Sequence, residues 1–181
     1  TSFAVKLANK FNGEIISADS RQIYKGMNIG TGKDLHEYKL KNKPIPYYLI
    51  DILNPDKDYS VFQFKNDFHN IYKQLNEKNK IPILCGGTAL YIDSILFNYD
   101  MSQIAPHPQI RNDLEKLSIK QLREKLLDRG QNLYDENFHV TKRRIIRSLE
   151  ISDPNNNKIN KSVDKSINNP LVIGMDVERE L

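Results

Sequence analysis

Apolar residues recur along the first hundred positions at the spacings of helices and strands in turn. Positions 3, 4, 7, 8 and 11 follow the helical period, so we expect an amphipathic helix over 2–11. Short apolar runs predict strands at 15–18, 47–52 and 81–85, and helical spacing returns over 61–75 and 90–95. Helices that alternate with short strands are typical of an α/β domain with a mostly parallel sheet.

The pattern changes after residue 103, where charged helical segments follow one another without strand signals. Helices are expected over 108–117, 118–127 and 140–151, and a polar connection rich in Asn and Lys over 153–169. The apolar run Leu171–Met175 then predicts a strand that returns to the sheet. We therefore predict an α/β core of residues 1–103 and 170–181, interrupted by a helical insertion of residues 104–169.

Composition narrows the class of protein. Of the 181 residues, 39% are hydrophobic and 28% are charged, as in soluble globular proteins. No apolar run reaches the length of a membrane span and no signal peptide is recognisable, so we expect no membrane contact and a cytoplasmic location. The net charge of +4 leaves room for a polyanionic partner. Since a helix begins at once after Thr1, without a methionine, and the last predicted strand lies close to Leu181, we expect truncation at both ends.

Polar residues follow two of the predicted strands. Asp19 comes directly after the first strand, and ligands of open α/β sheets bind beyond the carboxyl ends of the strands. Asp19 is therefore a candidate general base. Gly86, Gly87 and Thr88 follow the third strand at the start of a helix, where backbone amides and a hydroxyl suit a diphosphate. The alternative is a flexible turn in which Thr88 only caps the helix.

Thr1 has two interpretations. A threonine before a helix is commonly an N-cap. It is also the last residue of the phosphate-binding pattern G-x-x-x-x-G-K-[ST], whose hydroxyl contacts a metal or a phosphate. The strand that ends before Asp19 favours the second interpretation, because P-loop proteins run in the order loop, helix, strand.

The segment Lys142–Arg147 places four cations on one predicted helix. Arg143 and Arg147 are four residues apart, so they project from one face, and no carboxylate lies within the cluster. A solvated helix face is one explanation. A nucleic-acid backbone fits at least as well, because it supplies the missing negative charge.

Together these segments resemble the bacterial tRNA dimethylallyltransferases. The resemblance rests on ordered matches that cover nearly the whole chain: Ser17–Lys33, Leu49–Pro55 with Tyr59 and Ser60, Gly86–Tyr91, Pro108–Arg111, Arg144–Glu150 and Gly174–Leu181. It implies a P-loop NTPase-like fold of the nucleotide-binding type with a helical insertion, and a monomer. The glycine-rich phosphate loop and the C-terminal part of such enzymes would lie outside this sequence.

The resemblance also implies a reaction and its residues. A dimethylallyl group would pass from dimethylallyl diphosphate to the exocyclic amine of the adenosine 3′ to the anticodon, with Mg²⁺ on the diphosphate. Asp19 would take the proton of the amine and Thr88 would bind the bridging oxygen. Thr1, Gly86, Gly87 and Thr88 would bind the diphosphate, and Thr1 the metal. The residues implied in contact with the tRNA anticodon stem-loop are Asp19, Ser20, Arg21, Gln22, Arg111, Arg143, Arg144 and Arg147.

Two rival functions share some of these features. A small-molecule P-loop kinase has the same order of loop, helix and strand, but it would bind ATP and has no need of the arginine helix. A non-catalytic RNA-binding remnant would keep the arginines without the phosphate loop.

Overall fold

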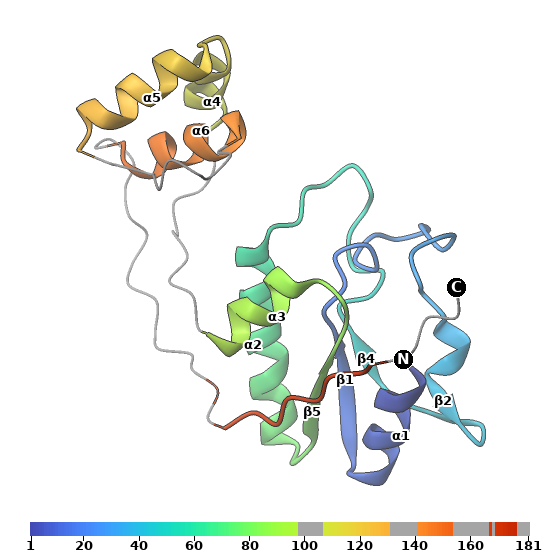
Figure 1. The fold of residues 1–181 in the computed structure, drawn as a ribbon. Helices are drawn as coiled ribbons and strands as arrows, with labels where there is room; N and C mark the ends of the chain where they lie inside the picture. The colour runs from blue at the N-terminus through green and yellow to red at the C-terminus, as the bar shows by residue number, and fades with distance from the viewer. Residues whose placement is uncertain (98–106, 131–140, 154–166, 168, 177–181) are drawn as a thin grey trace. The chain divides into compact units, whose positions relative to one another are not determined.

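The computed structural model describes residues 1–97, 107–130, 141–153, 167 and 169–176 (Figure 1). The chain divides into two compact units, one of residues 1–99 and 163–181 and one of residues 100–162. The predicted insertion of 104–169 overlaps the second unit over most of its length. None of the helices described is long and apolar enough to cross a membrane.

The first unit is a parallel sheet with helices on both faces (Figure 1). Its strands are β1 (Gly13–Ser17), β4 (Tyr47–Tyr48) and β5 (Ile81–Cys85), in the order β4-β1-β5, and β1 is parallel to both neighbours. Its helices are α1 (Ser2–Lys10), α2 (Val61–Glu77) and α3 (Ala89–Leu96). The predicted alternation of helices and parallel strands is therefore confirmed.

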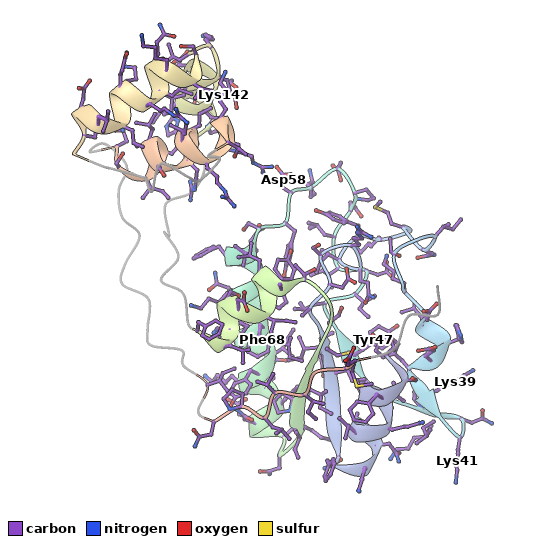
Figure 2. The ribbon with its side chains drawn as sticks, in the orientation of Figure 1. Lys39, Lys41, Tyr47, Asp58, Phe68 and Lys142 are labelled. Carbon is purple, nitrogen blue, oxygen red and sulfur yellow. The ribbon has the colours of Figure 1, made fainter. Side chains whose placement is uncertain are left out.

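Alternate side chains of β1 belong to two different cores. Ile15 is buried in a cluster with Val5 and Ala8 of α1. Ile16 is buried in a second cluster with Phe64 and Phe68 of α2, and Figure 2 labels Phe68 in that layer. Successive residues of a strand point to opposite faces, so a strand covered by helices on both sides is apolar throughout.

The long loop between β1 and β4 has little regular structure. It holds a 3-10 helix (Leu35–Glu37) and a short antiparallel pair, β2 (Lys39–Leu40) with β3 (Lys43–Pro44). Lys39 and Lys41 are exposed at this hairpin and point away from the rest of the unit (Figure 2).

Two strand predictions need correction. The strand predicted over 47–52 ends at Tyr48, because Leu49 and Asp51 have φ angles of 62° and 54°, in the left-handed region where a strand cannot continue. The predicted strand Leu171–Met175 is wrong. No described strand pairs with this segment, and Leu171 is 86% exposed. An apolar run forms a strand only where a neighbour satisfies its backbone groups.

The part of the second unit that the structure describes contains three helices, α4 (Pro108–Glu115), α5 (Ile119–Asp128) and α6 (Lys142–Ile151). They enclose a core of apolar side chains: Leu114, Leu122, Leu126, Ile145, Ile146 and Leu149. Ser118 begins α5 with a capping box in which its hydroxyl and the Gln121 side chain bond each other's backbone amides. The polar connection predicted over 153–169 lies mostly outside the described residues.

Candidate active site

The loops after β1 and β5 lie against each other at the carboxyl ends of these strands. The backbone amide of Ala18 donates to the carbonyl of Cys85 at 2.8 Å, and the amide of Thr88 donates to the carbonyl of Ala18 at 3.0 Å. This pairing extends the parallel ladder of β1 and β5 by one step. The structure thus brings together the two segments that carry Asp19 and Thr88.

Gly86 makes this approach possible. A Cβ atom at Gly86 would lie 2.4 Å from both the carbonyl carbon and the oxygen of Ala18, so only glycine fits. A Cβ atom at Gly87 would meet nothing within 4 Å. Gly86 is therefore required by its close approach to Ala18, whereas Gly87, exposed like Gly86, has open space where a side chain would lie.

The hydroxyl of Thr88 joins the two loops. Thr88 occupies the N-cap position of α3, but its side chain makes no bond to the helix. Instead Oγ1 accepts a hydrogen bond from the Ser20 amide at 3.0 Å and donates to Ser20 Oγ at 3.3 Å. The interpretation of Thr88 as a simple cap is therefore wrong. Its hydroxyl is held by the Ser20 amide and in turn donates to Ser20 Oγ over the longer distance of 3.3 Å, so its proton can bind another oxygen only by leaving that contact.

Asp19 is half-buried at the start of the same loop. Its Oδ1 accepts a hydrogen bond from the amide of Arg21 at 2.9 Å, which fixes the carboxylate in a local turn. Oδ2 accepts no hydrogen bond from the residues that the structure describes. Asp19 therefore keeps one oxygen available as a proton acceptor, and the Arg21 side chain is exposed beside it.

Tyr91 is a residue of this region to which the sequence assigned no role. Burial, followed by the electrostatic influence of Tyr24 and Asp19, raises the pKa of Tyr91 to about 12. Its ring stacks on Phe64, with centroids 4.1 Å apart. Tyr91 lies one helical turn after Thr88, and this spacing is the signal that could have identified it. Its hydroxyl stays protonated at neutral pH and can donate near Asp19.

The loop that carries Asp19 is tied down by buried polar side chains. Gln22 is buried, accepts a hydrogen bond from Ser17 Oγ at 3.0 Å and donates to the carbonyl of Gly32 at 3.0 Å. Its side chain is thus engaged within the loop, and its contact with tRNA stays a prediction. Lys33 has a fully buried side chain whose Nζ donates to the carbonyl of Tyr24 and to Asp51 Oδ1. Asp51 therefore neutralises the buried charge of Lys33.

Thr1 lies at the N-cap of α1, where its side chain makes no capping bond. Burial and then the electrostatic influence of Cys85 raise the pKa of Tyr38 to about 12, and the neighbouring Thr1 opposes this rise. Thr1 thus lies near Tyr38, and its side chain is not used by its own helix. Its role toward phosphate or metal stays a prediction.

Mg²⁺ also stays a prediction. No group of three or more His, Cys, Asp or Glu side chains that could hold a metal occurs in the part of the chain that the structure describes. Mg²⁺ on a phosphate substrate keeps several waters and needs few protein ligands, and the Ser or Thr that ends the phosphate-binding pattern is one of them, so the Thr1 hydroxyl fits that use.

Of the arginines predicted to contact RNA, Arg21 lies in the first unit and the others belong to the second: Arg111, Arg143, Arg144 and Arg147. Arg143 and Arg144 are exposed on α6 and form no ion pair with the described residues. Arg147 and Arg111 both pair with Glu150, whose side chain is fully buried. The cluster itself holds no carboxylate, as the sequence showed, but two of its cations find one outside it. Arg147 pairs with Glu150 one turn further along α6, and Lys142 lies 3.7 Å from Glu115 of α4.

The fold and the site together indicate the class of protein. A parallel sheet between helices, with a carboxylate and a hydroxyl from neighbouring strand-end loops, is typical of α/β enzymes that bind their ligands beyond the sheet. A family model described as IPP transferase matches residues 22–181. The chain belongs to this family.

Named relatives agree with this assignment. The chain is 45% identical over its whole length to tRNA dimethylallyltransferase 1 of Azobacteroides pseudotrichonymphae and 40% identical to tRNA dimethylallyltransferase 1 of Parabacteroides distasonis. It spans 59% of the length of each of these relatives.

Two solved structures share the fold. The full-length tRNA isopentenylpyrophosphate transferase of Bacillus halodurans has a TM-score of 0.52 and 32% identity, over 83% of this chain and 50% of the other. A eukaryotic dimethylallyltransferase acting on tRNA has a TM-score of 0.62 and 25% identity, over 82% of this chain and 37% of the other. The predicted P-loop NTPase-like α/β fold is confirmed.

Proposed function

We propose that the protein to which this chain belongs transfers a dimethylallyl group from dimethylallyl diphosphate to a tRNA. The acceptor is the exocyclic amine of the adenosine 3′ to the anticodon. The observation that carries the proposal is the hydrogen bond between Ser20 and Thr88, because it fixes the loop of Asp19 against the loop of Thr88 at one edge of the sheet. The named relatives support the class of reaction.

The reaction needs a base for the amine and donors for the leaving group. The amine nitrogen forms a bond to the first carbon of the dimethylallyl group while the bond from that carbon to the bridging oxygen breaks. Asp19 takes the proton from nitrogen, since its Oδ2 accepts no bond from described residues. Thr88 donates its hydroxyl proton as a hydrogen bond to the bridging oxygen, which receives the electron pair. The exposed Gly87 amide adds a donor for the departing diphosphate.

We further propose which residues bind Mg²⁺ and RNA, and where the protein acts. Mg²⁺, when bound with Thr1 as a ligand, would neutralise charge on the diphosphate. Arg143 and Arg144 bind the phosphate backbone of the anticodon stem-loop. Arg21, exposed beside Asp19, contacts the same RNA close to the acceptor base. The protein acts in the cytoplasm as a monomer.

The test compares Asp19→Ala with the unchanged full-length gene product. We expect the variant to lose transfer of labelled dimethylallyl groups to an anticodon stem-loop RNA while its affinity for that RNA is retained. Retained transfer in Asp19→Ala would contradict the role of this carboxylate. Binding of ATP in preference to dimethylallyl diphosphate would favour a small-molecule kinase, and RNA binding without binding of either would favour a non-catalytic protein.

A further inference from the structure

Glu150 is a buried carboxylate in the helical unit. Its side chain is fully shielded from solvent on α6, next to the core residue Leu149. A buried charge is costly unless it is paired and hydrogen-bonded. Oε1 accepts from the amide of His107 and from Arg111 Nε, both at 3.2 Å, and Oε2 accepts from Arg111 Nη2 at 2.8 Å and from Arg147 Nη1 at 3.3 Å.

These bonds fix the direction of two arginines from different helices. Arg111 of α4 meets the carboxylate with two donors on one edge of its guanidinium, so its remaining nitrogen, Nη1, is directed away from Glu150. Arg147 of α6 meets the same carboxylate from one turn earlier in the helix. The side chains of Arg111 and Arg147 are still 36% and 31% exposed. One buried anion thus holds two cations that reach solvent.

The surroundings are strongly positive. Two arginines around one glutamate leave one net positive charge, and the exposed Arg143 and Arg144 of α6 add two more. A phosphodiester oxygen pair matches the planar donor edge of a guanidinium. Arginine side chains have much rotamer entropy, so holding them in place before binding removes part of the cost of association.

We propose that Glu150 is a positioning residue that holds Arg111 and Arg147 in the geometry that receives a phosphate group of the RNA backbone. The inference rests on the proposed function, because it assumes that this unit binds RNA. It goes further by assigning a favourable role in RNA binding to a negative charge. Simple electrostatics predicts the opposite, namely that removal of any carboxylate from this unit strengthens RNA binding.

The test uses Glu150→Gln with Glu124→Gln as its matched control, both in the full-length gene product. Glu124 is exposed on α5 and forms no ion pair with described residues, so the two substitutions change the net charge equally. Affinity for an anticodon stem-loop RNA is measured against salt concentration. We expect Glu150→Gln to weaken binding about tenfold, the effect of one charge-assisted hydrogen bond, and Glu124→Gln to leave it equal or tighter.

The salt dependence separates lost geometry from lost charge. Glu150→Gln keeps every cation, so we expect an unchanged slope of log affinity against log salt at a lower affinity. A second variant, Arg111→Lys, keeps the charge but loses the two-donor edge, and should weaken binding to a similar degree. Circular dichroism shows whether Glu150→Gln folds. If it does not, Arg111→Lys still tests the proposed geometry.

Each outcome has a defined meaning. If Glu150→Gln binds the RNA as tightly as Glu124→Gln, or Arg111→Lys binds like the unchanged protein, Glu150 has a structural role only and the inference is overturned. If the unchanged protein does not bind the RNA, the proposed function fails, and the inference fails with it.

Discussion

The buried ion pair of Lys33 and Asp51 gives an asymmetry that can be measured. Lys33 Nζ lies 2.6 Å from Asp51 Oδ1, and the two side chains are 0% and 32% exposed. The pair ties the Asp19 loop to the turn after β4. We predict that Asp51→Asn destabilises the protein more than Lys33→Met does, although each removes the same interaction.

The magnitudes follow from the unequal burial. Asp51→Asn leaves an ammonium without water and with only neutral oxygens as partners, at a cost of about 3–5 kcal/mol. Lys33→Met removes the buried charge and keeps the length of the side chain, while Asp51 is exposed enough to be hydrated. The Lys33→Met substitution therefore costs only the free energy of one charge-assisted hydrogen bond, about 1.5–3 kcal/mol. Asparagine tolerates the left-handed backbone of Asp51, so strain adds little.

The assay is urea unfolding followed by tyrosine fluorescence, since the chain has nine tyrosines and no tryptophan. We expect Asp51→Asn to cost about 2 kcal/mol more than Lys33→Met. The double variant should resemble Lys33→Met, because no buried charge remains. Equal costs, or a larger cost for Lys33→Met, would refute the reasoning from burial.

Two more predictions concern the close approach at the site and the carboxylate of the helical unit. Gly86→Ala should lower the melting temperature and abolish transfer, because its Cβ would overlap Ala18. Gly87→Ala should leave the melting temperature unchanged. Equal shifts of the melting temperature in the two variants would contradict the role of Gly86. Burial alone would raise the pKa of Glu150, but Arg111, Arg147 and the His107 amide outweigh it and hold the pKa below its ordinary value of 4.5. Its stabilising effect is therefore complete above pH 4.5 and is lost as the pH falls through the lower folded value, so unfolding of the unchanged protein and of Glu150→Gln should converge in acid.

The regular elements could be predicted from the sequence because their signals are local. The helical period of α2 and the apolar runs of β1 and β5 need no knowledge of distant residues. The end of β4 could not be predicted, since Leu49 and Asp51 adopt a left-handed backbone that non-glycine residues rarely take. The strand predicted over Leu171–Met175 was wrong for a related reason, because a strand needs a neighbouring strand to satisfy its backbone hydrogen bonds.

The candidate site was predicted in part. Asp19 and Thr88 could be placed at one sheet edge because parallel strands align their carboxyl ends. The contacts of Gln22 with Gly32, of Lys33 with Asp51 and of Glu150 with Arg111 could not be predicted, because only the fold brings these residues together. Polar residues within a loop resemble ligand-binding residues in the sequence. The burial and hydrogen bonds of Gln22 and Lys33 show that these two side chains also hold the loop in shape.

Mass analysis of the target adenosine tests the central proposal most directly. The full-length gene product is incubated with an anticodon stem-loop RNA, dimethylallyl diphosphate and Mg²⁺, and the RNA is digested to nucleosides. We predict that the adenosine 3′ to the anticodon gains the mass of one dimethylallyl group less the hydrogen that it replaces. An unmodified adenosine at this position, in RNA that the protein is shown to bind, would contradict the proposed reaction.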